Sequence, residues 1–138
     1  EYLTIVIKLL LATGLGMLIG TEREIHKKPA GLRTHSLVAL GSCLFTLIVL
    51  RMVGSTTESM SRIIQGIVVG VGFIGAGMIF QSRSTARVGG LTTAAEVWTL
   101  AAIGVLVGLG SYFIAIASTA LILIILVPFK WVKMKVRS

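Results

Sequence analysis

The feature that most constrains this chain is the length of its apolar runs. The longest extends from Leu91 to Pro128, with Glu96 as its only charged residue. As one helix it would reach about 57 Å, nearly twice the ~30 Å hydrocarbon core of a bilayer, so it must fold back on itself. Glycine weakens a helix, so we place the turn near Gly108, Gly110 and Ser111. The run therefore predicts two membrane-spanning helices.

The composition of the whole chain supports a membrane protein. Of its 138 residues, 55% are hydrophobic and 13% are charged, and the mean hydropathy is +0.97. A soluble domain carries about 25% charged residues, so a soluble fold and a disordered chain are both excluded. The sequence predicts a single all-α transmembrane domain over residues 1–138. Its five helices are expected at about 3–20, 36–53, 63–80, 91–109 and 111–129.

The distribution of Lys and Arg predicts how the helices are oriented. Lys8, Arg51 and Arg62 lie on one side of the expected membrane. Because basic loops stay in the cytoplasm, the N terminus is predicted outside, and loops 21–35 and 81–90 and the C terminus in the cytoplasm. The basic tail 130–138 is expected to meet anionic headgroups. The net charge of +8 is then a topology signal and not a nucleic-acid surface. The basic residues on the predicted cytoplasmic side are Arg23, Lys27, Lys28, Arg33, Arg83, Arg87, Lys130, Lys133, Lys135 and Arg137.

Glycines at four-residue spacing predict close packing between helices. Residues four apart share one helix face, where small side chains let two backbones approach. The helix over 63–80 holds the most glycines, so it is expected to be crowded and central, or else a mobile helix beside a polar path. The candidate packing glycines are Gly16, Gly20, Gly66, Gly70, Gly72, Gly75, Gly77, Gly104 and Gly108.

Glu96 is the charged residue that most invites a functional interpretation. Charged side chains within a spanning segment are costly and usually functional. Alternatively, Thr93 and Glu96 fit a capping box, in which Thr93 would begin the helix and Glu96 would bond back to it. The two readings are compatible. Trp98 is expected to be a packing anchor whose indole N–H needs a partner.

The densest polar segment precedes the second expected helix. Glu22 and His26 are four residues apart and can meet on a helix, and Thr21 with Glu24 is a second capping-box match. Arg33 adjoins the membrane, where it can pair with Glu96. We therefore predict a polar node at the cytoplasmic mouth of the bundle. Its candidate residues are Glu22, Arg23, Glu24, Arg33, Thr34, His35, Thr93, Glu96 and Trp98.

Several chemistries are disfavoured by the residues available. Aspartate is absent, and His26 and His35 are poorly spaced for zinc. No phosphate-binding loop or catalytic signature is present, so the protein is not expected to be an enzyme. No cofactor is identified, although weak Mg²⁺ binding by glutamates stays open because Mg²⁺ needs only one or two carboxylates.

Four ordered motifs run along nearly the whole chain. They are Gly20–Glu24, Pro29–His35, Gly70–Gly77, and Gly90–Ala95 followed by Trp98 and Ala101–Gly104. Together they resemble the membrane domain of the MgtC/SapB family. The resemblance implies a multi-pass protein of the bacterial inner membrane, associated with Mg²⁺ limitation, acid stress and survival inside host cells. It also implies regulation of other membrane complexes, with the F-type ATP synthase as one partner. Many members carry a C-terminal cytoplasmic domain, so this chain is expected to be a short member, and many have an uncharged residue where Glu96 stands.

Three functions follow as expectations. The first is an accessory or regulatory membrane protein, present as a homodimer or in a membrane-protein complex. The second is a small transporter or channel that uses Glu96 and the glycine-rich third helix. The third is a Mg²⁺ or pH sensor at the polar node.

Overall fold

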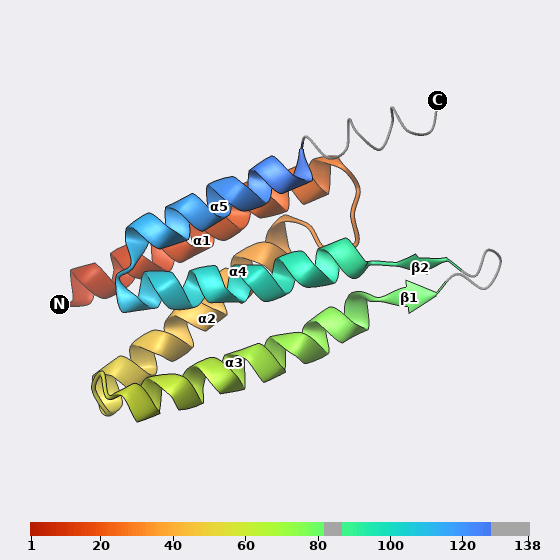
Figure 1. The fold of residues 1–138 in the computed structure, drawn as a ribbon. Coiled ribbons are helices and arrows are strands. Elements are labelled where there is room, and N and C mark those ends of the chain that lie inside the picture. Colours follow the sequence, from red (N-terminus) through yellow and green to blue (C-terminus); the bar gives the residue numbers. More distant parts are fainter. Residues whose placement is uncertain (82–86, 128–138) are drawn as a thin grey trace.

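The computed structural model describes residues 1–81 and 87–127. Over these residues the chain forms five helices, as predicted, and a short antiparallel hairpin that pairs Phe80 with Gly89 and Gln81 with Val88. The elements, shown in Figure 1, are α1 (Tyr2–Ile25), α2 (Leu32–Met52), α3 (Thr57–Met78), β1 (Phe80–Gln81), β2 (Val88–Gly89), α4 (Leu91–Leu109) and α5 (Tyr112–Leu126).

Four of the helices, α1 to α4, are long and apolar enough to cross a membrane. The chain is therefore a multi-pass membrane protein. The fifth helix, α5, is apolar but has 15 residues, which corresponds to about 22 Å of helix. A fifth crossing and the orientation of the termini stay predictions, and the expected basic tail lies outside the described residues.

The structure differs from the expected boundaries at three connections, at two of them because a polar segment belongs to a helix. The first helix runs on to Ile25 and the second begins at Leu32, so the connection is residues 26–31 and not 21–35. The third helix begins at Thr57, because the Thr56 side chain accepts a hydrogen bond from the Ser59 amide at 3.3 Å and caps it. Instead of a plain loop over 81–90, strands β1 and β2 pair.

The central helix of the bundle is α4, and the prediction that the third helix is central is wrong. Of the most apolar 18-residue stretch of α4, 61% is buried within the bundle, against 17% of the corresponding stretch of α3. Figure 1 shows α3 at the edge of the bundle, where it diverges from α2. Its buried residues are Ile67, Val71 and Gly75. The glycines of α3 thus do not mark a crowded position in this chain.

Two glycines of α1 allow α2 to lie directly against it. A Cβ atom at Gly16 would be 2.7 Å from the carbonyl oxygen of His35, and one at Gly20 would be 2.7 Å from the Cα of Leu32. Real Cβ atoms do not approach backbone so closely. The predicted close contact at this glycine pair is therefore confirmed.

Two glycines of α4 allow an equally close contact with α2, further along the same helix. A Cβ atom at Gly104 would collide with the carbonyl oxygen of Ala39, and one at Gly108 would be 2.7 Å from the Cβ of Thr46. Both α1 and α4 therefore approach the backbone of α2 closely, and Ala39 is contacted from both helices, which confirms the second predicted pair.

The turn between α4 and α5 lies where the sequence predicts it. Gly110 adopts φ +85°, a left-handed conformation that closes the end of α4, and α5 begins two residues later at Tyr112. Gly90, with φ +82°, precedes α4 at its other end, where a Cβ would collide with the carbonyl oxygen of Met78. Glycine is thus required at both ends of the central helix.

Lys8, which interrupts the first apolar run, holds the end of α4. Its Nζ donates a hydrogen bond of 2.8 Å to the carbonyl oxygen of Gly108. The last carbonyl groups of a helix lack partners within the helix and carry the negative end of its dipole. The ammonium group therefore satisfies a terminal carbonyl in a setting where water is scarce.

We expect Lys8→Met to lower the free energy of unfolding by about 2 kcal/mol, because it removes a charged hydrogen bond and leaves a carbonyl without a partner. Thermal unfolding in dodecyl maltoside would measure the change. Lys27→Met is the matched control, since Lys27 is exposed. An equal change in both variants would contradict a specific role for Lys8.

Candidate functional site, a buried charged cluster between α1 and α4

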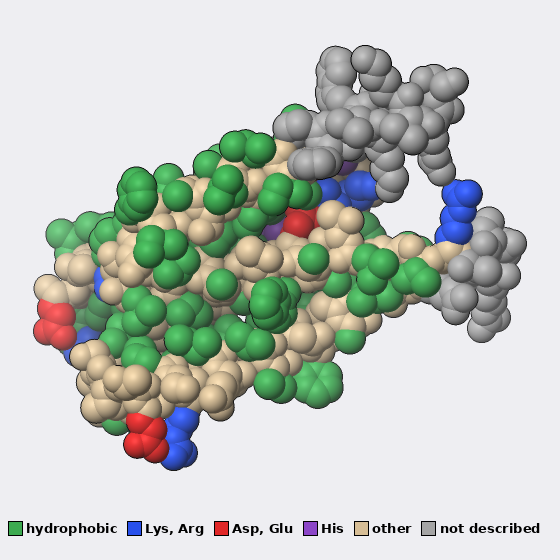
Figure 2. All heavy atoms as spheres, viewed as in Figure 1, with side chains coloured by type: hydrophobic (Ala, Val, Ile, Leu, Met, Phe, Trp, Pro, Cys, Tyr) green, Lys and Arg blue, Asp and Glu red, His purple; other side chains and the backbone are tan. Residues whose placement is uncertain are grey.

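The last turns of α1 and the first turns of α4 bring four polar side chains together. Glu22 and Arg23 come from α1, and Thr93 and Glu96 from α4. All four are buried, with Arg23 only 4% exposed and Glu96 6%. We call these four residues the charged cluster. Figure 2 shows basic, acidic and histidine side chains gathered at this end of the molecule.

Arg23 is the centre of the charged cluster. Its Nε lies 3.0 Å from Oε2 of Glu96, and its Nη1 lies 3.4 Å from Oε2 of Glu22. Its Nη2 donates a hydrogen bond of 3.4 Å to Oγ1 of Thr93. One guanidinium group therefore ties the end of α1 to the start of α4, across 70 or more residues of chain.

His26 extends the charged cluster toward the surface. Its Nδ1 lies 2.8 Å from Oε1 of Glu22, one helical turn earlier, and the side chain of His26 is 35% exposed. The predicted pairing of Glu22 with His26 is confirmed.

The charged cluster is short of hydrogen bonds. Although the charges are close, Arg23 Nε and both carboxylate oxygens of Glu96 have no hydrogen-bond partner among the described residues, and Glu22 Oε1 has only the ion contact with His26. The 3.0 Å contact between Arg23 and Glu96 is thus an ion pair without an aligned hydrogen bond. Native proteins satisfy most buried polar atoms. Two carboxylates therefore share one guanidinium in the charged cluster without full hydrogen bonding.

Three residues of the predicted node lie outside the charged cluster. Glu24 accepts a hydrogen bond of 2.8 Å from the amide of Leu32 and so holds the start of α2. Arg33 is exposed, and the Arg that pairs with Glu96 is Arg23. Trp98 is 51% exposed, on the side of α4 that faces α3. These residues do not join the charged cluster.

Two residues beside α1 complete the account of the predicted node. His35 is fully buried, its Nδ1 lies 2.9 Å from the carbonyl oxygen of Gly31, and its Nε2 has no partner among the described residues. Thr34 is partly buried. Both are on the first turn of α2, which packs on the glycines of α1.

Both predicted capping boxes are wrong. Helix α4 begins at Leu91, with Gly90 as its N-cap, so Thr93 lies inside the first turn and accepts a hydrogen bond from Arg23. Thr21 is within α1 and donates to the carbonyl oxygen of Met17. In both cases the helix starts earlier than the polar pattern indicates. Glu96 is therefore a buried partner of Arg23 and not a cap.

The described part of the chain, residues 1–81 and 87–127, holds no group of three or more His, Cys, Asp or Glu side chains arranged to bind a metal ion. Glu22 and Glu96 are the two carboxylates of the charged cluster, and Arg23 contacts both. Mg²⁺ that keeps most of its waters needs no more than such a pair.

Comparison with known proteins identifies the family of this chain. It is 39% identical to Protein SrpB of Synechococcus elongatus over 94% of this chain and 77% of SrpB. It is 46% identical to Protein MgtC of Salmonella typhimurium and 38% identical to Protein SapB of Bacillus subtilis, over 86% and 96% of this chain. The chain spans about half the length of MgtC (49%) and 59% of SapB. No solved structure matches it. Since the model of the MgtC family also matches residues 9–135, the chain belongs to the MgtC family.

Proposed function

We propose that this protein is a regulator of Mg²⁺ homeostasis in the bacterial cytoplasmic membrane, and that it acts by binding other membrane proteins. Membership of the MgtC family and at least four potential membrane spans support this proposal. The F-type ATP synthase is a candidate partner by family resemblance. The polar end of the bundle, where α1 ends and α4 begins, is the element through which regulation would act.

The observation that carries the proposal is the charged cluster. Arg23, Glu22 and Glu96 are each less than a tenth exposed, and four of their polar atoms have no hydrogen-bond partner among the described residues. A purely structural ion pair of such low exposure would be costly without full hydrogen bonding. A buried arginine shared by two glutamates is therefore suited to a change in protonation or ion occupancy.

The geometry supports a simple form of control. Arg23 joins α1 to α4 through Glu96 and Thr93. A proton on Glu96, or a hydrated Mg²⁺ between Glu96 and Glu22, would weaken the hold of Arg23 on Glu96. The ends of α1 and α4 would then separate, and residues 26–31, which follow α1, would move with them. Those residues are the surface that we expect a partner to contact.

We expect that Glu96→Gln, unlike the natural chain, does not restore growth of a deletion strain in low Mg²⁺, because it removes the charge that Arg23 binds. Growth of a complemented deletion strain at micromolar and millimolar Mg²⁺ measures the effect, with membrane levels of the protein determined in parallel. Glu58→Gln is the matched control, since Glu58 pairs with Arg62 at the exposed start of α3. Normal growth of the Glu96→Gln strain, at normal protein levels, would contradict the proposal.

A second candidate is a small transporter of cations or protons. Its support is the presence of two carboxylates with unpaired oxygens in helices long enough to span a membrane. Vesicles that hold the purified protein and a Mg²⁺- or pH-sensitive dye separate the two functions. Flux that depends on Glu96 favours the transporter. Absence of flux in vesicles, together with growth in low Mg²⁺ that depends on Glu96, favours the regulator.

A further inference from the structure

Four glycines of α3 have no explanation within a single copy of this chain. A Cβ atom added at Gly66, Gly70, Gly72 or Gly77 would meet no atom within 4 Å. The glycines of α1 and α4 that pack on α2 differ sharply, since a Cβ there would collide with backbone. Apart from proline, glycine is the least favourable residue inside a helix. A stretch of open glycines in α3 therefore calls for a close contact that one copy does not make.

One face of α3 differs from the rest of its outer surface, where aliphatic side chains such as Val68 and Val69 are exposed. Helix α5 shows the usual pattern, with large aliphatic side chains such as Leu121 and Ile124 exposed by 59% and 58%. Spacings of four, three and four residues place Gly66, Gly70, Phe73 and Gly77 on one face of α3. The side chain of Phe73 is 77% exposed. One helix face thus combines small residues with a single large aromatic side chain. Such a face is typical of contact between helices in membranes.

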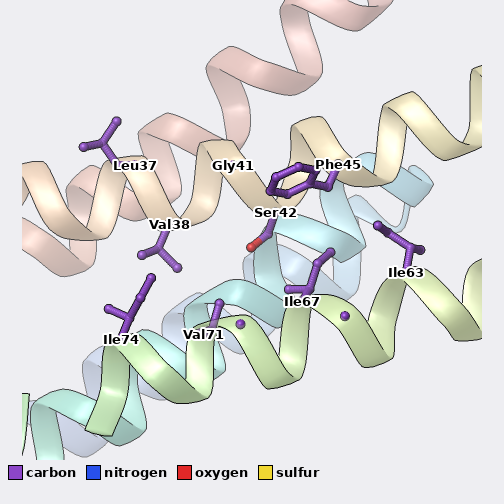
Figure 3. Close-up of a pocket in the computed structure, with 11 residues that line it drawn as sticks. Leu37, Val38, Gly41, Ser42, Phe45, Ile63, Ile67, Val71 and Ile74 are labelled. Atoms are coloured by element: carbon purple, nitrogen blue, oxygen red, sulfur yellow. The ribbon is translucent and has the colours of Figure 1, made fainter. Parts of the chain in front are cut away.

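A groove between α2 and α3 adjoins this face. It has a volume of about 500 Å³ and is lined by Gly66 and Gly70 together with apolar side chains of both helices. Figure 3 shows Ser42 of α2 with its hydroxyl directed into the groove. Ser42 is only 4% exposed, and no described residue hydrogen-bonds its hydroxyl. Thr46 and Thr119 instead donate to the carbonyl four residues earlier. The groove therefore offers an unfilled hydrogen-bonding position, which a lipid chain cannot fill.

Gln65 provides the complementary group on α3. It is exposed within a helix that can span the membrane, and its one hydrogen bond is a 3.4 Å contact with Ser61. Ser42 lies ten residues before the end of α2 and Gln65 eight residues after the start of α3. At 1.5 Å per residue, their distances along the two helices from the connection at 53–56 differ by about 3 Å. A two-fold axis along the bilayer normal keeps each residue at the same depth in both copies.

We propose that α3 of a second copy of this chain packs in the groove between α2 and α3, so that the protein is a homodimer around a pair of α3 helices. Each copy supplies the same surface, as a two-fold interface requires. The open glycines let the two α3 backbones approach, and Phe73 of one copy covers the glycines of its partner. Gln65 of one copy reaches the Ser42 hydroxyl of the other. This inference is independent of the proposed function.

Association in vesicles tests the interface directly. Copies labelled at the N terminus with donor or acceptor dyes are mixed in vesicles of phosphatidylcholine and phosphatidylglycerol, and energy transfer is followed as lipid is added. We expect Gly70→Ile to weaken association by about tenfold or more. Gly14→Ile is the matched control on α1, where a Cβ also meets nothing within 4 Å, and should associate like the natural chain. A monomeric natural chain, or equal association of Gly70→Ile, would overturn the proposal.

Cross-linking places the contact on α3. Cys43 is the only cysteine of the chain, so a Cys43→Ala background allows single new thiols. We expect Phe73→Cys to form disulfide-linked dimers in oxidised membranes, while Ile124→Cys on the outer face of α5 should not. Equal cross-linking at both positions, or none at Phe73→Cys, would contradict an α3 interface. Thermal unfolding of each variant in detergent confirms that it is folded.

Discussion

Arg23→Met should lower the free energy of unfolding by about 3–5 kcal/mol. The substitution leaves Glu22 and Glu96 buried without their guanidinium partner, and an uncompensated buried charge is among the most destabilising changes known in proteins. The connection from α1 to α4 through Thr93 is lost as well. Unfolding by sodium dodecyl sulfate in mixed micelles, followed by circular dichroism, would measure the loss.

Two further variants make this expectation specific. Arg62→Met removes an ion pair of similar length, 2.7 Å to Glu58, but both side chains are more than three-quarters exposed, so the expected change is below about 1 kcal/mol. Arg23→Met combined with Glu96→Gln should recover much of the loss, because one of the two unpaired charges is then absent. If the double variant is as unstable as the sum of the two single ones, Arg23 and Glu96 do not act as a pair.

Gly104→Leu should be the most damaging substitution in the apolar part of the bundle, with an expected loss of about 3 kcal/mol or more. A Cβ at this position collides with the carbonyl oxygen of Ala39 and lies 2.8 Å from the Cβ of Ser42. The Ala39 oxygen belongs to the backbone of α2, which cannot rotate away. The two helices must therefore separate along their length, and the thermal unfolding temperature in detergent should fall accordingly.

Gly14→Leu provides the comparison for this variant. It adds the same side chain to a helix that can span the membrane, at a position with nothing within 4 Å. Its unfolding temperature should stay close to that of the natural chain. A similar loss in both variants would indicate that helix propensity, and not the contact between α2 and α4, determines the cost.

Hydropathy predicted the number of helices because apolar length is what a bilayer selects. The excess length of the last apolar run required a turn, and glycine indicated its place after α4, where Gly110 adopts a left-handed conformation. Hydropathy failed at the polar ends of helices. Glu22 and Arg23 belong to the last turns of α1 although their composition resembles a loop, because an ion pair between neighbouring turns and burial against α4 continue the helix.

The residues of the charged cluster could be proposed from the sequence, but their pairing could not. Glu96, Glu22, Arg23 and Thr93 were all candidates, and the structure brings them together. The choice of Arg23 over Arg33 as the partner of Glu96 depends on how the end of α1 is rotated against α4, which no spacing within one segment reveals.

Glycine spacing showed which residues share a face but not which face has a neighbour. For this reason the same pattern was right for Gly104 and Gly108 and wrong for the place of α3 in the bundle. From the sequence, Lys8 was assigned only to the basic residues on one side of the membrane. Its hydrogen bond joins residues 100 positions apart, and a lone lysine in an apolar run carries no signal of such a partner.

The contact between Lys8 and Gly108 bears on the order in which the chain is made. When α1 leaves the ribosome and enters the translocon, the carbonyl that Lys8 will bind has not yet been synthesised. Its ammonium group must wait near the lipid headgroups or in the translocon channel until α4 arrives. The contact between Lys8 and Gly108 therefore forms late in biogenesis, only after the fourth helix has been inserted.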